Sequence, residues 1–181
     1  MLRTLPATRD FSALQRLAAV AFFALLTVLS ARVRIDFYPV PFTLQPLVVL
    51  FSGLVLGARD GALSQLAYIT LIAFNLPVDT NYLGAAAFAS GTGGFLVGFV
   101  PAAWTAGFLA QRGADKLWMR WLAGVAGLVV LYGFGCAWLL IIGRTPQIIV
   151  ENVIRPLFAL DLIKAFIAAG LTESGRALLK R

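Results

Sequence analysis

Asp161 and Lys164 place opposite charges three residues apart within residues 156–171, a run that is otherwise apolar. Because side chains at i and i+3 share one face of a helix, the carboxylate and the ammonium would project from the same side. Charges at membrane depth are expensive and usually mark a functional site. The carboxylate could accept N–H groups of a polar ligand while the ammonium donates to a ligand oxygen. The alternative is an ion pair that only fixes how this helix packs.

Composition and hydropathy predict an integral membrane protein. Of 181 residues, 60% are hydrophobic and 13% are charged, and the mean hydropathy is +0.88. A water-soluble domain needs a more polar surface than this. The length suits a single membrane domain over residues 1–181, with roughly five to seven crossings of about 20 residues each. We therefore expect no soluble catalytic or nucleotide-binding domain.

Apolar runs between charged positions predict an all-α fold with six transmembrane helices and elaborate outer loops. The predicted spans are residues 11–31, 44–58, 61–78, 93–110, 121–143 and 154–171. Residues 59–61 are too few for anything but a tight turn between the second and third spans. Residues 81–111 carry no charge, and as one helix they would exceed the hydrocarbon thickness. The glycines of residues 90–94 predict a break, so the fourth helix should begin near Gly93.

The distribution of Lys and Arg predicts the orientation, because short cytoplasmic loops are richer in these residues. With both termini in the cytoplasm, that side carries Arg3, Arg9, Arg16, Arg59, Arg112, Lys116, Arg120, Arg176, Lys180 and Arg181, and the outer side carries Arg32, Arg34, Arg144 and Arg155. The outer connections are then residues 32–43, 79–92 and 144–153, where we expect ligand capture. The scattered basic residues explain the net charge of +7, so no nucleic-acid partner is predicted.

Residue types that are absent narrow the chemistry. The chain has no His and a single Cys, Cys136, which excludes histidine metal sites, Ser–His dyads and disulfides within the chain. It has no G-x-x-x-x-G-K-[ST] motif, so it cannot hydrolyse ATP by the P-loop mechanism. We predict no cofactor. The aromatic residues Trp104, Trp118, Trp121 and Tyr132 suit membrane interfaces and receive no chemical role.

The first outer connection has features of a lid. Residues 36–46 contain three prolines, which stiffen an extended loop. Phe42 adds an apolar face, while Thr43 and Gln45 add hydrogen-bonding groups suited to covering a small molecule. The alternative is a plain connector that ends one helix and starts the next.

The segment Thr92, Gly93 and Gly94 opens the predicted fourth helix. Free N–H groups and the helix dipole could bind a carboxylate there. The spacing of Gly94 and Gly98 equally suits close helix packing, and both interpretations can hold together.

Several of these segments together resemble the BioY family, the biotin-binding membrane components of energy-coupling-factor (ECF) transporters. The matching motifs are PVPFTLQ at residues 39–45, LPV at 76–78, TGGFLVGF at 92–99 and Pro156-x4-Asp161-x2-Lys164. They occur in the family's order and cover most of the chain. The resemblance implies a six-helix protein of the cytoplasmic membrane that binds biotin for uptake. It also implies an ECF transmembrane coupling protein and ATP-binding subunits as partners, and no enzymatic activity of the chain itself.

The resemblance further implies which residues bind biotin. Phe42, Thr43 and Gln45 would belong to the lid, Thr92, Gly93 and Gly94 to the end of the second outer loop, and Asp161 and Lys164 to the floor of the pocket. Asn81 and Tyr82, near the start of the second outer loop, are further candidate ligand residues. The two N–H groups of the ureido ring would then donate to Asp161, and the ring carbonyl oxygen would accept from Lys164. The biotin carboxylate would meet backbone N–H groups near Gly93 or the side chain of Asn81.

The sequence departs from the family pattern in residues 79–90, which lack the usual glycine-rich composition, and at Gly91, where proline is common. A biotin relative or another small vitamin-like carboxylate therefore stays open as the ligand. A membrane-embedded enzyme with Asp161 as general acid or base is an alternative of another class, although the chain lacks a nucleophile and base set. A purely structural membrane protein would leave the intramembrane charges and the proline-rich loop unexplained.

Overall fold

The structure is a computed structural model that describes residues 12–113 and 116–179. In chain order its elements are α1 (Ala13–Ser30), β1 (Arg34–Ile35), β2 (Phe42–Thr43), α2 (Gln45–Leu56), α3 (Ala58–Ala73), the 3-10 helix η2 (Gly84–Ala89), α4 (Gly93–Gly113), α5 (Leu117–Ile141), α6 (Pro146–Ile149), the π-helix η3 (Val150–Phe158) and α7 (Ala159–Leu179). The two strands form an antiparallel β1–β2 hairpin, with Arg34 opposite Thr43 and Ile35 opposite Phe42. The sequence predicted only an extended loop there.

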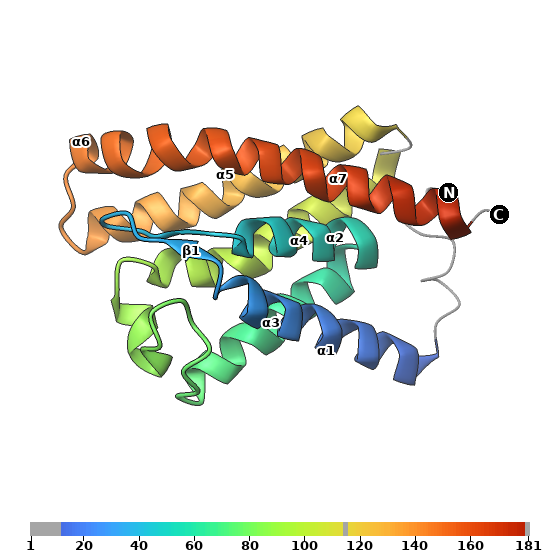
Figure 1. The fold of residues 1–181 in the computed structure, drawn as a ribbon, viewed down its shortest axis with the longest axis horizontal. Helices are drawn as coiled ribbons and strands as arrows, with labels where there is room; N and C mark the ends of the chain where they lie inside the picture. Colours follow the sequence, from blue (N-terminus) through green and yellow to red (C-terminus); the bar gives the residue numbers. More distant parts are fainter. Residues whose placement is uncertain (1–11, 114–115, 180–181) are drawn as a thin grey trace.

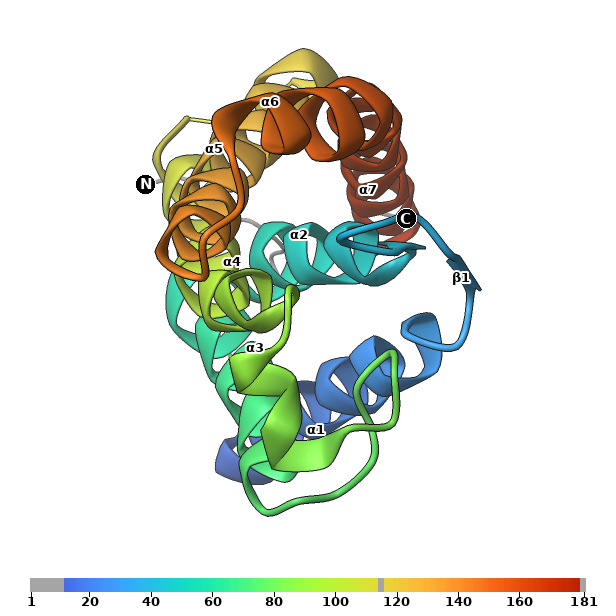
Figure 2. The same cartoon turned by 90° about the vertical axis from the view of Figure 1, so that its left-hand side faces the viewer.

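The helices pack in three layers (Figure 1 and Figure 2). α2 and α4 form the middle layer, α5 and α7 cover one side, and α1 and α3 cover the other. Each middle helix contacts helices of both outer layers. The main hydrophobic core lies between the layers and includes Leu50 of α2, Ala103 of α4 and Leu128 of α5.

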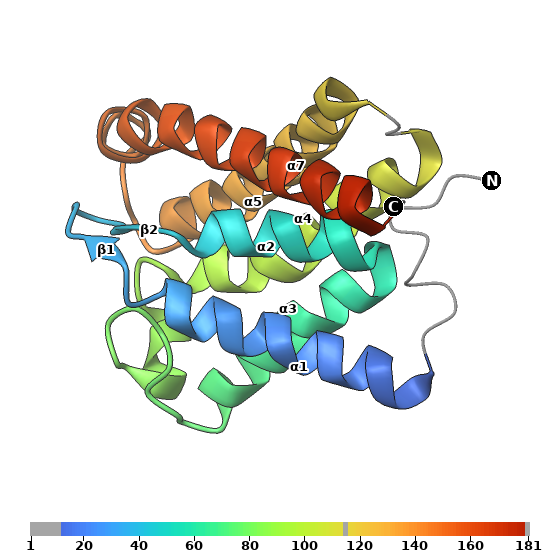
Figure 3. The same ribbon diagram turned by 45° about the vertical axis from the view of Figure 1, so that its right-hand side comes forward.

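The two ends of the bundle differ. One end, called the loop end here, carries the β1–β2 hairpin, η2 and α6, whereas α1 begins and α7 ends at the opposite end (Figure 1 and Figure 3). The three segments that the sequence predicted as outer connections therefore gather at one end of the molecule.

Three helices are long and apolar enough to cross a membrane, namely α1, α4 and α5. α2 is apolar but has 12 residues, about 18 Å at 1.5 Å per residue, which is shorter than the hydrocarbon core. α3 has 16 residues, and α7 carries Asp161, Lys164 and further charges. Length and composition of the described helices thus support three of the six predicted crossings, and the other three stay a prediction.

The joint between α2 and α3 differs from the predicted turn. Gly57 alone connects the two helices, and Arg59, Asp60 and Gly61 lie at the start of α3. The chain reverses within one residue because glycine adopts the observed φ of 85° without the penalty that a side chain brings. α3 ends at Ala73 instead of residue 78, since the Leu-Pro-Val segment that follows cannot continue a helix.

The last helical region is the largest departure from the predicted spans. The sequence predicted a loop at residues 144–153 and a helix from residue 154, but the helix begins at Pro146 after the N-cap Thr145. It continues through η3 into α7. Pro156 lies inside η3, where its missing N–H would interrupt an α-helical ladder, and the backbone takes the wider π spacing around it. α5 likewise begins at Leu117 rather than residue 121.

The fourth helix begins at Gly93, as predicted, and η2 occupies part of the break before it. The predicted start of the first span, residue 11, lies outside the described residues. So do four of the basic residues used for the orientation, Arg3, Arg9, Lys180 and Arg181.

Glycine permits the closest helix contacts of the middle layer. A Cβ on Gly53 of α2 would lie 2.2 Å from the carbonyl oxygen of Ala103 in α4, and one on Gly107 of α4 would lie 2.5 Å from the backbone nitrogen of Ala58. A Cβ on Gly61 of α3 would lie 2.7 Å from the Gly53 Cα. Because the opposing atoms belong to the backbone, a side chain at these positions would push the helices apart.

We expect Gly53→Ala to lower the thermal stability of the protein in detergent, because overpacking against a backbone costs about 1 to 3 kcal/mol. Gly133→Ala is the matched control, since a Cβ at Gly133 of α5 meets nothing within 4 Å and alanine favours a helix more than glycine does. Thermal unfolding of both variants measures the difference. A Gly53→Ala protein as stable as the parent would contradict the close approach of α2 and α4.

Candidate functional site

A small cavity lies at the loop end beneath the β1–β2 hairpin. It has a volume of about 50 Å³, against roughly 300 to 1,000 Å³ for typical small-molecule sites. Its walls are mostly apolar, with polar side chains from several segments converging on it. The lining residues are Val40, Pro41, Phe42, Thr43, Gln45, Pro46, Asp79, Thr80, Thr92, Phe95, Leu96, Phe99, Leu131, Tyr132, Leu157, Asp161 and Lys164.

Asp161 and Lys164 of α7 form a buried ion pair at this cavity. Lys164 Nζ lies 2.5 Å from Asp161 Oδ1, and each residue is 4% exposed. Nζ also donates to the backbone carbonyl of Thr43 at 2.6 Å and lies 3.6 Å from the centroid of the Phe42 ring. The two charges therefore share a helix face, as their spacing predicted, and they contact the hairpin as well as each other.

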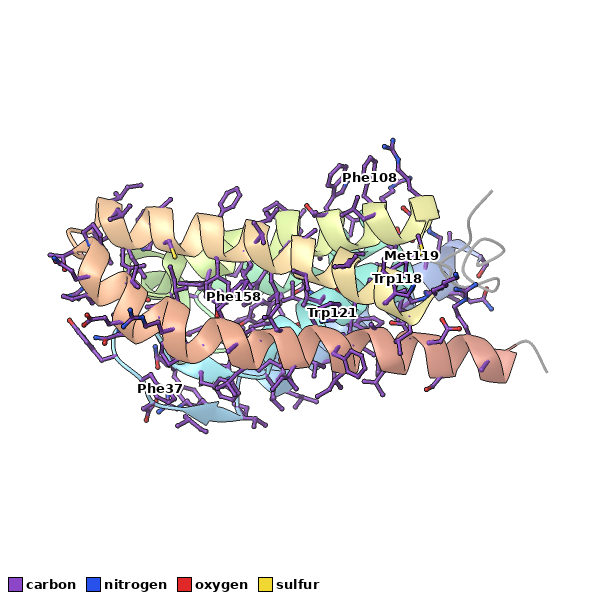
Figure 4. The ribbon with its side chains drawn as sticks, turned by 90° about the horizontal axis from the view of Figure 1, so that it is seen from above. Phe37, Phe108, Trp118, Met119, Trp121 and Phe158 are labelled. Carbon is purple, nitrogen blue, oxygen red and sulfur yellow. The ribbon has the colours of Figure 1, made fainter. Side chains whose placement is uncertain are left out.

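Tyr132 of α5 is the second partner of the Asp161 carboxylate. Its hydroxyl donates to Asp161 Oδ2 at 2.7 Å, and its ring stands edge-on against Phe158 with the centroids 5.1 Å apart. Figure 4 shows Phe158 between α5 and α7. Tyr132 is buried, so it is not the interfacial aromatic that the sequence predicted. The sequence contained a signal for this role of Tyr132, because a tyrosine hydroxyl in the middle of an apolar run needs a hydrogen-bond partner.

A second polar cluster forms another part of the wall. Gln45, at the start of α2, donates through Nε2 to the Tyr68 hydroxyl at 2.8 Å. Its Oε1 accepts from Thr80 Oγ1 at 2.9 Å and from Thr43 Oγ1 at 3.4 Å. All four residues are buried. The hairpin, α2, α3 and the loop before η2 thus meet through one hydrogen-bonded network, which holds their relative positions.

Asp79 organises the loop between α3 and η2. Its carboxylate accepts from the N–H groups of Asn81 and Gly84, both at 2.9 Å, and the residue is buried. Asp79 and Thr80 line the cavity, although sequence reasoning assigned them no role. Asn81 and Tyr82, which the sequence analysis named as candidate ligand residues, are exposed and lie outside the lining.

Gly93 and Gly94 lie on a different surface from the cavity. With Trp138 they line an apolar groove between α4 and α5, and a Cβ on Gly94 would lie 2.2 Å from the Trp138 Cβ. The N–H of Gly93 donates to the carbonyl of Ser90 at 3.1 Å, so it is not the free donor that the sequence predicted. Close helix packing, the alternative interpretation, accounts for these contacts, and Thr92 is the member of this segment that lines the cavity.

The structure therefore brings six of the predicted binding residues to one cavity, namely Phe42, Thr43, Gln45, Thr92, Asp161 and Lys164. This site offers a carboxylate, an ammonium group, an amide and hydroxyl groups above apolar walls. Such a combination suits reversible capture of a small molecule that has a polar head and an apolar part. Within residues 12–113 and 116–179, no three His, Cys, Asp or Glu side chains gather into a metal-binding group.

Comparisons with known proteins point to one family. A family model described as the BioY family matches residues 4–181. The biotin transporter BioY of Thermotoga maritima is 37% identical over 157 residues, which cover 86% of this chain and 92% of the relative. The biotin transporter BioY of Rhizobium etli is 38% identical over 178 residues, covering 90% and 92% of the two chains.

A solved structure shares the fold. The crystal structure of the S-component for biotin from an ECF-type ABC transporter matches with a TM-score of 0.80, over 95% of this chain and 96% of that chain. The two sequences are 22% identical, so the match concerns the arrangement of the helices.

We expect Lys164→Met to lower the free energy of unfolding by about 3 to 5 kcal/mol, because it leaves the Asp161 carboxylate buried without its cation. Adding Asp161→Asn to the same chain should recover most of this loss, since a buried pair replaced on both sides is often neutral. Thermal unfolding in detergent without ligand compares the variants. Lys116→Met, which removes an exposed lysine, is the control. A double variant as unstable as Lys164→Met would mean that the stranded charge is not the cause.

Proposed function

The chain belongs to the BioY family, and we propose that it binds biotin for uptake across the cytoplasmic membrane, as the substrate-binding subunit of an ECF transporter. The observation that carries this proposal is the cavity in which Tyr132, the Asp161–Lys164 pair and the β1–β2 hairpin converge. The relatives named biotin transporter that are described above support biotin as the ligand.

The polar groups of the cavity match the ureido ring of biotin. The ring has two N–H donors and one carbonyl oxygen, while Asp161 supplies a carboxylate acceptor and Lys164 an ammonium donor. Hydrogen bonds to charged groups are stronger than those between neutral groups. If the Asp161 carboxylate and the Lys164 ammonium separate and each binds the ureido ring, the site would bind ligands with this ring more tightly than ligands without it. The sulfur-containing ring and the valerate chain would lie against apolar residues such as Phe95, Phe99 and Leu131.

Binding of biotin requires the cavity to enlarge. Its volume of about 50 Å³ is well below the range of small-molecule sites, and Lys164 bridges α7 to the hairpin through the carbonyl of Thr43. Lys164 would exchange Thr43 for the ligand carbonyl and release the hairpin. Tyr132 would keep its hydrogen bond to Asp161 Oδ2, so the carboxylate stays in position while its other oxygen turns to the ligand.

The biotin carboxylate would point from the cavity toward the outer loops. Thr92 lines the cavity beside these loops, and we assign the carboxylate to the segment around it. Asn81, Tyr82, Gly93 and Gly94 lie outside the lining and would contact biotin only after the loops move.

The membrane arrangement that fits this role has six crossings and both termini in the cytoplasm. α1, α4 and α5 have the length and apolarity of crossings. α2 would cross in the middle layer, shielded from lipid by its neighbours, whereas α3 and α7 would present exposed apolar side chains such as Leu66 and Phe166 to lipid. The loop end would then face outward and capture biotin. Because the chain has no P-loop motif, an ECF transmembrane coupling protein and ATP-binding subunits would supply the energy.

We expect biotin and dethiobiotin, which share the ureido ring, to raise the melting temperature of the protein, whereas lipoate, a comparable carboxylate without that ring, should not. A ligand that binds only the folded state stabilises it, so thermal unfolding with each compound reads out binding. Equal stabilisation by lipoate would favour a general site for small vitamin-like carboxylates. Chemical conversion of bound biotin, detected by mass spectrometry, would favour a membrane enzyme that uses Asp161 as acid or base.

We expect Asp161→Asn to weaken biotin binding by about 1.5 to 3 kcal/mol, the usual worth of a hydrogen bond to a charged group. The double variant Asp161→Asn with Lys164→Met should remain folded but lose biotin-dependent stabilisation. Calorimetry and thermal unfolding in detergent measure these effects. Thr172→Val, which removes another buried polar group of α7, is the control. Full biotin-dependent stabilisation of the double variant would mean that the ion pair serves packing alone.

A further inference from the structure

Two arginines of the first outer connection bind the loop at residues 77–81: Arg32 from the turn after α1, and Arg34 from strand β1. Arg32 donates through Nη1 to the carbonyl of Asp79 at 3.2 Å and through Nη2 to the carbonyl of Pro77 at 3.0 Å. Arg34 donates through Nη1 to the carbonyl of Thr80 at 2.7 Å. The planar guanidinium group of Arg32 thus binds two carbonyl oxygens at once, which a lysine ammonium on a flexible chain reproduces poorly.

The connected segments are the two that cover the cavity. The hairpin contributes Phe42 and Thr43 to the lining, and the loop contributes Asp79 and Thr80. Arg34 lies opposite Thr43 in the hairpin. A continuous series of contacts therefore runs from the loop, through Arg34 and the paired strand, to the residue whose carbonyl accepts from the cavity lysine.

The loop is held in a shape that it would not adopt freely. Tyr82 has a φ of 58°, in the left-handed region that bulky side chains avoid. The guanidinium carbon of Arg32 lies 4.1 Å from the centroid of the Tyr82 ring, and Asn81 Oδ1 accepts from Arg34 at 3.0 Å. Strained conformations persist where the surroundings fix them, so the two arginines help to impose the shape of this loop.

The location of Arg32 and Arg34 is unusual for basic residues of a membrane protein. In the proposed orientation they lie on the outer side, where Lys and Arg are less frequent than in cytoplasmic loops. Their neighbour Asp36 is an exposed partner, 3.5 Å from Arg34 Nε, and such surface pairs contribute little. The hydrogen bonds to the loop carbonyls are therefore the main role that the structure gives to these two charges.

We propose that Arg32 and Arg34 are positioning residues of the biotin site, which tie the turn after α1 and the hairpin to residues 77–81 as a single cover and so slow the release of bound ligand. The inference rests on the proposed function. Neither residue lines the cavity, so both act through the segments that they hold together. The competing explanation is electrostatic steering, in which two positive charges attract the biotin carboxylate and accelerate association in a salt-dependent way.

The test measures association and dissociation rates of biotin for the full chain in detergent, at low and high salt. One variant, Arg32→Gln with Arg34→Gln, removes both charge and hydrogen bonds, and a second, Arg32→Lys with Arg34→Lys, keeps the charge. Arg155→Gln, which removes an exposed arginine near the loop end, is the control. We expect both double variants to release biotin about tenfold faster or more, since hydrogen bonds to charged groups are each worth about that factor, with association and the control nearly unchanged.

Four outcomes would overturn the proposal. Release of biotin by the Lys variant at the parent rate would mean that charge alone is important. A Gln variant that loses only association rate, and loses more of it at low salt, would support steering. A parent chain that binds no biotin would overturn both this inference and the proposed function, whereas a binding parent with unchanged variants would remove only the role of the arginines. Thermal unfolding without biotin checks the fold of each variant.

Discussion

The ion pair between Asp161 and Lys164 is the interaction on which the loop end depends. Two charges buried in an apolar bundle need partners, and these partners come from separate segments: Tyr132 from α5, and Thr43 and Phe42 from the hairpin. α7 cannot slide or rotate against α5 without separating a charge from its hydrogen bonds. The pair thus specifies the position of the last helix as well as the chemistry of the cavity.

The molecule divides into a rigid base and a cover. In the base, α2, α3 and α4 approach at glycines whose missing side chains allow direct backbone contact, and such contacts have few alternative arrangements. The cover consists of the hairpin and the loop before η2, which are joined to the base by side-chain hydrogen bonds of residues such as Gln45 and Lys164. In the proposed function, bonds to the ligand would replace some of these hydrogen bonds, so that the cover opens while the base stays packed.

The features that could be predicted from the sequence are those that a short stretch of residues determines by itself. Apolar runs revealed the membrane class, and the spacing of Asp161 and Lys164 revealed their common face. Charged residues were taken as the ends of spans, although helices continue past them, which is why the joint at Gly57 and the helix start at Pro146 were missed. The contact of Tyr132 with Asp161 joins residues 29 positions apart, and only the packing of two helices reveals it. The same holds for the hydrogen bonds between distant loops.

The π-helix η3 sets the rotational phase of everything that follows it. A π turn contains more residues than an α turn, so the nine residues of η3 determine the direction in which each side chain of α7 points. One residue corresponds to about 100° of rotation in an α-helix. A single deletion here would turn Asp161 and Lys164 toward neighbouring helices or lipid without changing any residue of α7. An insertion or deletion between α6 and α7 would therefore disrupt the site more than one in an exposed loop.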